Sequence, residues 1–240
     1  MRKILVLALS LGLFWTTAAQ ATTLFSEDFS DPATAGARFD VMNIGSGSFT
    51  FNGTACVTTD FVALVWTNAA NQFVEDGSAK VTYQVEEDMT VGSGLQRTAL
   101  GARMDGSVFA TCYGMYHYYD GSTGSVKFVR YNNDVETALF DSGTITAAQN
   151  ELPVIMSITL ENTATSVNWT IQYGSYSMSG SDTDANRITS GVATGLTYYN
   201  ASGSNSCNFD NLMVTVVPEP ATLSLLSAGA VACILRRKRK

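Results

Sequence analysis

The chain has 240 residues, of which 45% are hydrophobic and 15% charged, and 14 Lys and Arg against 21 Asp and Glu give a net charge of −7. Such an acidic balance argues against nucleic acid as a partner, because the phosphate backbone repels negative charge. A single histidine and the absence of a CxxC pair exclude multi-histidine and zinc-finger metal sites.

The first 21 residues have the order of a secretory signal peptide. Arg2 and Lys3 precede an almost unbroken apolar run over residues 4–15. The small residues Ala19 and Ala21 then occupy the two positions that a signal peptidase reads. We therefore predict that residues 1–21 are removed on export.

Residues 22–217 contain short alternating segments separated by Gly, Asn, Asp and Ser, and none sustains a helical period. Polar and apolar side chains alternate most clearly at 166–173, 152–160 and 81–85, as in half-buried strands. The apolar stripes also place Trp66 and Trp169 in the core. Further strands are expected at 24–29, 48–51, 61–66, 98–104, 108–119, 126–131, 137–140, 192–199 and 209–216. About a dozen strands without helices predict an all-β fold, a two-sheet antiparallel β-sandwich or jelly roll, as one domain.

Three groups of residues resemble laminin-G-like and concanavalin-A-like jelly rolls. Residues 100–106, 113–119 and 126–131 are similar to the central hairpins of these domains. Residues 195–200 and 209–212 resemble their closing strands, and residues 25–29 resemble the opening strand, which in that fold lies beside the last. The resemblance spans most of residues 24–216 and implies the fold, whereas function depends on the site that the fold carries.

The tyrosine-rich segment 113–119 is the best candidate for binding a ligand. Tyr113, His117 and Tyr119 project from one strand face, and Tyr116 and Tyr118 from the other. One face must be core, and the other would offer rings on which sugars can stack. Two arginines on neighbouring strands could bond hydroxyls or carboxylates. The candidate glycan-binding residues are Tyr113, Tyr116, His117, Tyr118, Tyr119, Arg103 and Arg130; alternatively, the tyrosines only cover the sheet.

Enzymes with this fold cleave polysaccharides, so a hydrolase or lyase is the alternative function. The hydrolases use two carboxylates that alternate along one strand. Glu86 and Asp88 would share a face, but a solvated strand end explains them better. The lyases need a histidine beside a tyrosine and a basic residue, for which His117 is the only candidate. We assign no catalytic residue.

Acidic residues near both ends of the domain suggest a structural calcium ion. Glu27 and Asp28 lie on the expected opening strand, and Asp210 on the closing one. If these strands pair, their oxygens could bind Ca²⁺; otherwise they are ordinary surface acids.

Three cysteines fall within the predicted domain: Cys56, Cys112 and Cys207. They allow at most one internal disulfide, in any of three pairings. Export to an oxidising compartment would permit such a bridge.

The C-terminus has three features in fixed order: Pro218-Glu219-Pro220, an uncharged stretch over 221–235, and five terminal cations. A helix of 15 residues rises about 22 Å, which is short for a bilayer but tolerable when basic side chains snorkel. The cations favour a cytoplasmic end. These residues resemble the PEP-CTERM sorting signal of Gram-negative bacteria that often produce extracellular polysaccharide. The resemblance implies that an exosortase in the inner membrane recognises Pro218, Glu219 and Pro220 and processes residues 218–240.

Removal of both ends makes the remaining domain more acidic. The signal peptide holds two cations and the tail five cations and one anion, which leaves 7 cations against 20 anions in residues 22–217, a net charge near −13. We therefore expect an exported cell-surface or extracellular-matrix protein that does not bind nucleic acid. Its predicted role is non-catalytic, either binding glycan or contributing structure in extracellular polymer.

Overall fold

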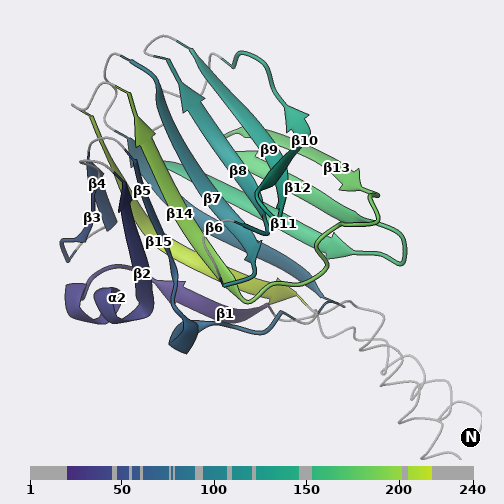
Figure 1. Cartoon of the computed structure of the whole chain (residues 1–240), viewed down its shortest axis with the longest axis horizontal. Helices are drawn as coiled ribbons and strands as arrows, with labels where there is room; N and C mark the ends of the chain where they lie inside the picture. Colours follow the sequence, from purple (N-terminus) through teal and green to yellow (C-terminus); the bar gives the residue numbers. More distant parts are fainter. Residues whose placement is uncertain are drawn as a thin grey trace, which may run out of the picture. The chain divides into compact units, whose positions relative to one another are not determined.

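The fold is described from a computed structural model of the whole chain (Figure 1). It describes residues 21–44, 48–53, 56–59, 62–75, 77, 79–89, 94–106, 110–120, 123–145, 153–201 and 205–217. Thr23–Val216 forms a compact unit of its own within the predicted domain. Ala19, Pro218, Glu219, Pro220 and the predicted membrane stretch 221–235 lie outside these ranges. Inside them, no helix is long and apolar enough to cross a membrane.

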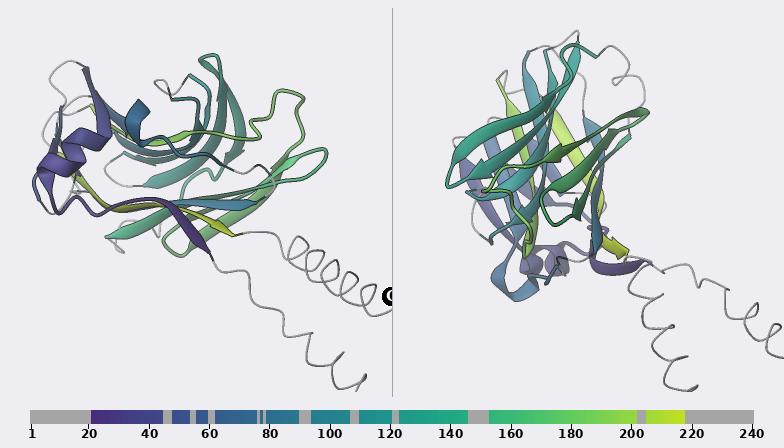
Figure 2. Two further views of the ribbon diagram at one scale, coloured as in Figure 1. Left: turned by 90° about the horizontal axis from the view of Figure 1, so that it is seen from below. Right: turned by 90° about the vertical axis from the view of Figure 1, so that its right-hand side faces the viewer.

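The strands form two sheets that lie one over the other (Figure 2). Sheet A has the order β13 (Tyr176–Asp182), β12 (Val167–Tyr173), β11 (Val154–Asn162), β6 (Lys80–Met89), β15 (Ser206–Val217), β4 (Cys56–Thr59) and β3 (Ser48–Phe51), with β1 (Thr22–Glu27) paired to β15. Sheet B has the order β10 (Val135–Asp141), β9 (Gly124–Asn132), β8 (Cys112–Tyr119), β7 (Gln96–Met104), β14 (Ala193–Asn200), β5 (Val62–Thr67) and β2 (Phe39–Ile44). The predicted two-sheet antiparallel β-sandwich is confirmed.

The core lies between the sheets and is built from the predicted alternation. On β6, Val81, Tyr83 and Val85 are fully buried. Tyr83 lies opposite Ile158 of β11, which lies opposite Ile171 of β12, so one apolar row crosses three strands. Burying each aliphatic side chain of this kind stabilises the fold by about 1.5–3 kcal/mol. Sheet A is therefore held against sheet B by a continuous apolar layer.

Sheet B has a second face, which points away from sheet A, and we call it the outer face. In the left view of Figure 2, sheet B is the upper layer, and its edges bend away from sheet A so that the outer face is concave. Sheet A is the lower layer, with β1 and β15 side by side in it. The concave outer face of sheet B is the setting of the site described below.

A short helix, α2 (Pro32–Arg38), follows β1 where no helix was expected. The Asp31 side chain accepts hydrogen bonds from the backbone N–H of Ala33 at 3.0 Å and of Thr34 at 3.4 Å. An acidic cap followed by proline is a helix-start signal, but seven residues are too few to display a helical period. The 3₁₀ turn η1 (Ala69–Asn71) and strands β2, β4 and β13 were also not predicted.

An irregularity near the end of β7 decides where Arg103 points. Arg103 has a φ of 53°, and the pairing of β14 with β7 shifts register between Ala193 and Gly195. A Cβ atom at Gly191 would lie 2.2 Å from the Arg103 Cα, so only glycine allows this close approach. The bulge turns Arg103 into the sandwich, whereas the next residue, Met104, packs on the outer face.

Candidate functional site

Strand β8 carries the tyrosine-rich segment, and the structure decides which of its faces is core. Tyr113, Met115 and Tyr119 belong to the core between the sheets. Tyr116 and Tyr118 lie on the outer face of sheet B. Only these two of the seven predicted glycan-binding residues therefore reach the face that could receive a ligand.

Tyr113, Tyr119 and Arg130 are buried inside the sandwich and hold it together. The Tyr113 hydroxyl donates to Asp182 Oδ2 at 2.8 Å, and its ring stacks on Phe128 with centroids 5.6 Å apart. Arg130 Nη1 donates to both Asp182 oxygens at 2.8 Å. Burial raises the pKa of the Tyr113 hydroxyl, which therefore stays protonated. We correct the prediction for Tyr113 and Arg130, because their contacts are structural. The Tyr119 ring belongs to the core cluster but also lines the larger hollow of the groove described below.

His117 is buried as well, between β8 of sheet B and two strands of sheet A. Its Nδ1 lies 3.2 Å from Glu87 Oε1 and 3.0 Å from the Tyr173 hydroxyl, and its ring stacks on Tyr173 at 4.2 Å. Thr98 Oγ1 donates to the other Glu87 oxygen at 2.9 Å. The histidine is 1% exposed. It is therefore placed neither to contact a glycan on the surface nor to act as the base of a lyase groove.

Arg103 is fully buried in a second polar cluster, so its predicted glycan contact is also corrected. Its Nε donates to Glu75 Oε2 at 2.7 Å, and its Nη1 donates to Asn162 Oδ1 at 2.7 Å. The Tyr83 hydroxyl donates to the other Glu75 oxygen at 2.7 Å. Burial raises the pKa of Glu75, and the charge of Arg103 opposes that effect. This cluster links β6, β7 and β11 rather than facing solvent.

The outer face carries a row of tyrosines across β8 and β9. The Tyr116 ring lies 6.0 Å from that of Tyr118 and 6.4 Å from that of Tyr131. The Tyr116 hydroxyl donates to the Tyr131 oxygen at 3.1 Å, and the Tyr131 hydroxyl donates to Glu136 Oε2 at 2.6 Å. Burial, followed by the bond to Glu136, raises the pKa of Tyr131 to about 12. These bonds fix the rings as a rigid platform.

Trp66 is buried, as predicted, but β5 presents it to the outer face of sheet B rather than to the layer between the sheets. It packs there with Met104, Cys112 and Ala193. Trp169 does lie in the core, as predicted, with its ring 5.0 Å from that of Phe128. Since Cys207 is buried in the core cluster, Cys112 and Cys207 belong to separate buried clusters, and the structure offers no support for a bridge between them.

A groove crosses the outer face beside Tyr118, and we call it the Tyr118 groove. A hollow of about 240 Å³ is lined by Leu95, Arg97, Tyr118 and Tyr199. A second hollow of about 390 Å³ adjoins it at Leu95 and Tyr118 and continues over Ser125, Lys127 and Asp141. Strand pairing sets Tyr199 beside Arg97 and Arg97 beside Tyr118. The groove therefore runs across the strands of sheet B.

Arg97 is the cation at the centre of the groove. Its guanidinium carbon lies 5.1 Å from the Tyr116 ring centroid, 5.7 Å from that of Tyr199 and 5.8 Å from that of Tyr118. The Lys127 ammonium lies 5.8 Å from the Tyr118 centroid on the other side. Sequence reasoning missed Arg97, Lys127 and Tyr199. The alternation of β7 and β9 could have found the first two, whereas only the fold brings Tyr199 of β14 to the groove.

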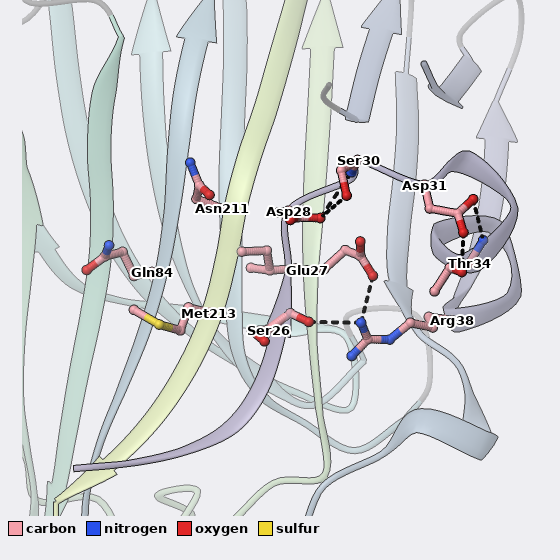
Figure 3. A pocket seen from close by; sticks show the side chains of 11 residues that line it. Ser26, Glu27, Asp28, Ser30, Asp31, Thr34, Arg38, Gln84, Asn211 and Met213 are labelled. Carbon is pink, nitrogen blue, oxygen red and sulfur yellow. Dashed lines mark hydrogen bonds and ion pairs between the residues drawn. The ribbon is translucent and has the colours of Figure 1, made fainter. Parts of the chain in front are cut away.

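Another hollow, of about 410 Å³, lies where β1, α2 and β15 meet (Figure 3). Its carboxylates bond to their own neighbours. Glu27 Oε2 accepts from Arg38 Nη1 at 2.7 Å, and Glu27 Oε1 accepts from the backbone N–H of Phe29 at 3.0 Å. Asp28 Oδ1 accepts from the backbone N–H of Ser30 at 3.1 Å and from its hydroxyl at 2.7 Å. The polar groups drawn here thus form a structural corner.

The predicted calcium ligands belong to this corner, and their geometry does not fit a three-carboxylate site. Both oxygens of Glu27 are engaged as described, and Figure 3 shows its carboxylate directed toward Arg38. In the part of the chain described above, no three His, Cys, Asp or Glu side chains form a group that could hold a metal ion. Ca²⁺ binding by Glu27, Asp28 and Asp210 therefore stays a prediction.

The candidate hydrolase pair lies far from the Tyr118 groove in the fold. Glu86 and Asp88 alternate on β6 with the buried Val85 and Glu87, so they face away from sheet B. Glu86 Oε2 accepts a hydrogen bond from Asn211 Nδ2 at 3.1 Å. Neither carboxylate can act on a ligand bound to the outer face of sheet B.

Comparisons with known proteins identify the tail and the fold. Residues 216–240 match the PEP-CTERM protein-sorting motif, which indicates export and sorting by an exosortase. No curated protein matches the chain. A legume lectin-like domain from Entamoeba histolytica is similar in structure, with a TM-score of 0.57, 11% identity and coverage of 82% of this chain and 98% of that one.

Two further structures share the fold. A protein of unknown function with a galectin-like fold from Bacillus subtilis has a TM-score of 0.53 and 11% identity, and 83% of this chain and 100% of that one are covered. The exoplasmic/lumenal domain of VIP36, in its Ca²⁺/Man3GlcNAc-bound form, has a TM-score of 0.50 and 10% identity, with coverage of 83% and 90%. At these identities the likeness shows the fold alone, a lectin-like jelly roll.

Proposed function

We propose that this is a glycan-binding protein of the cell surface or extracellular matrix, with the Tyr118 groove as its binding site. The observation that carries the proposal is the cross-strand row of Tyr199, Arg97 and Tyr118 on a concave sheet face, with Lys127 beside Tyr118 in the adjoining hollow. Sugar rings present apolar C–H faces that stack on aromatic rings, while their hydroxyls bond to charged side chains. Two structures of similar fold support this choice: one is a legume lectin-like domain, and the other is the VIP36 domain in its Ca²⁺/Man3GlcNAc-bound form.

The sorting motif supports the location that we propose. Residues 216–240 match the signal that an exosortase processes, so the domain is delivered from a Gram-negative inner membrane to the cell surface or beyond. There the partner of the groove would be extracellular polysaccharide. The net charge near −13 keeps the released domain soluble and disfavours nucleic acid.

A structural metal ion is a separate hypothesis, which the glycan-binding proposal does not need. The VIP36 structure is a calcium-bound form, and another similar structure, the carbohydrate recognition domain of Emp46p, is potassium-bound. Those ions are properties of those proteins. For this chain, a test of Ca²⁺ at the corner formed by β1 and β15 is set out in the Discussion.

The proposal is tested with two tyrosines of β8, using protein purified from cells that express the full chain. Tyr118→Ala should weaken polysaccharide binding about tenfold, equivalent to about 1.4 kcal/mol, without loss of the fold. Tyr113→Ala is the control, because the Tyr113 ring is buried in the core. It should cost about 3–5 kcal/mol of stability and leave binding by the folded fraction unchanged.

Affinity electrophoresis over a panel of acidic and neutral polysaccharides measures binding, and thermal unfolding measures stability. If Tyr118→Ala binds like the unchanged protein, the groove is not the site. Product analysis of the same mixtures addresses the hydrolase and lyase alternative. Cleavage that disappears in a folded His117→Ala variant would favour the lyase.

A further inference from the structure

The Tyr118 groove contains Arg97, which forms no ion pair with a carboxylate among the described residues. Arg187 forms none either, but it lies in a loop and donates to the backbone carbonyls of Asp184 and Ala164. Arg38, Arg103 and Arg130 each lie 2.8 Å or less from a carboxylate. Among the residues that the structure describes, no carboxylate forms an ion pair with Arg97, although the domain has 20 acidic residues and 7 basic ones. Arg97 has no carboxylate partner in the described part of the chain and lines a hollow on the surface, so it is available to an anion from outside.

The side chains around Arg97 hold its guanidinium in place without accepting hydrogen bonds from its N–H groups. Three tyrosine rings, of Tyr116, Tyr118 and Tyr199, lie within 6 Å of the guanidinium carbon. Its buried Nε has no hydrogen-bond partner. A ring contact attracts the cation but takes up none of the five N–H donors that lie in the guanidinium plane. The group is thus oriented beforehand and still able to donate.

Lys127 adds a second positive charge in the adjoining hollow, on the far side of Tyr118. Its ammonium is 3.6 Å from Asp141 Oδ2, and both side chains are partly exposed. Such an exposed pair contributes little and can exchange its partner for a ligand. Two cations therefore flank the ring on which a sugar would stack.

We propose that the ligand of the groove is an acidic polysaccharide, with a uronate carboxylate bound by Arg97 while a sugar ring stacks on Tyr118. This inference rests on the proposed glycan-binding function and names its ligand class. Guanidinium and carboxylate form paired hydrogen bonds, which lysine or a neutral donor cannot reproduce. The negative net charge of the domain opposes polyanions in general, but salt at 0.15 M screens charges beyond about 8 Å, so the two cations of the groove, Arg97 and Lys127, dominate the attraction of a carboxylate placed between them.

The test compares polygalacturonate with its carboxyl-reduced, neutral derivative, using protein purified from cells that express the full chain. The unchanged protein should bind polygalacturonate at least about tenfold more tightly than the reduced polymer. Arg97→Gln should remove that difference, and Arg97→Lys should restore only part of it. Arg187→Gln is the control, because it makes the same charge change at a loop where Arg187 donates to the Asp184 and Ala164 carbonyls.

Each outcome separates this inference from the proposed function. Equal binding of both polymers by the unchanged protein, lost in Tyr118→Ala, would overturn the acidic ligand and leave the glycan site standing. An equal loss of polygalacturonate binding in Arg97→Gln and Arg187→Gln would reduce the effect to net charge and overturn the role of Arg97. Binding of neither polymer, nor of any other glycan, would overturn both. Circular dichroism of each variant shows that the fold is retained.

Discussion

Glu87 is a carboxylate with no exposure to water, and it is bonded on both oxygens. Thr98 and His117 belong to sheet B, whereas Glu87 and Tyr173 belong to sheet A, so the cluster joins the sheets. The Nδ1 atom of His117 contacts Glu87 and the Tyr173 hydroxyl, whereas Nε2 on the other side of the ring is buried without a hydrogen-bond partner. At the residue scale, this is where the interior is most sensitive to the loss of one polar group.

Glu87→Ala should lower the free energy of unfolding by about 3–5 kcal/mol, because it leaves buried polar partners uncompensated. Glu86→Ala is the matched control: the neighbouring side chain faces solvent, and its removal should change stability by no more than about 0.5 kcal/mol. Urea denaturation of both variants measures the difference. Equal stabilities would mean that the cluster does not hold the sheets together.

Residue positions also show what sequence could not decide. Alternation placed Tyr113 and Tyr119 on one face of the strand and Tyr116 and Tyr118 on the other. It could not show which pair is buried, because that depends on where sheet A lies. Arg103 escaped alternation altogether, because a left-handed backbone at its own position turns it inward. Arg97 could be recognised as part of a site only from its contact with Tyr199, and that contact exists only because β14 pairs with β7.

At the scale of elements, the corner formed by β1 and β15 brings Asp210 close enough to Glu86 and Asp28 for their charges to act on it. Desolvation raises the pKa of Asp210, and the charges of Glu86 and Asp28 raise it further, against the bond from the Asn211 backbone. A carboxyl whose pKa is raised in the folded state is easier to ionise when unfolded. Its charge therefore lowers stability as the pH rises from about 4 through the folded-state pKa.

Asp210→Asn should stabilise the protein at pH 7 by up to about 1 kcal/mol, a limit set by the exposure of the group to solvent. The gain should vanish near pH 3, where the carboxyl is protonated. Thermal melts at both pH values, each with calcium and with chelator, provide the measurement. From the geometry of the corner we expect the calcium and chelator melts to coincide.

Calcium binding would give the opposite pattern. An ion that binds only the folded state, at 100 times its dissociation constant, adds about 2.7 kcal/mol. Calcium would then raise the melting temperature of the unchanged protein, and Asp210→Asn would remove the rise instead of stabilising the fold. That result would support the calcium site predicted from Glu27, Asp28 and Asp210.

Strand prediction succeeded where alternation was clear and failed where a strand carries no apolar stripe. Residues 166–173 and 81–85 alternate over enough positions to identify β12 and β6. Strand β4 has four residues, and β13 keeps mostly exposed side chains, so neither shows an apolar stripe. The outcome for α2 is similar, since its start signal was present in Asp31 and Pro32 but its length was too short.

For the whole molecule, the two ends predict a processed protein. Cleavage after Ala21 and removal of the sorting tail should yield a chain that begins near Thr22 and lacks Cys233 and the basic terminus. Intact-mass measurement on exported material from a Gram-negative host with an exosortase checks both. A mass that still includes residues 236–240 would contradict the proposed processing.

The central claim is that glycan binds to the outer face of sheet B, in the Tyr118 groove. Nuclear magnetic resonance of isotope-labelled protein, titrated with acidic and neutral oligosaccharides, tests it most directly because each residue reports separately. We predict that the shifts concentrate on Arg97, Tyr118, Lys127 and Tyr199, with Tyr113 and His117 nearly unaffected. Shifts centred on the corner of Glu27 and Asp28, or spread without any focus on the groove, would contradict the account.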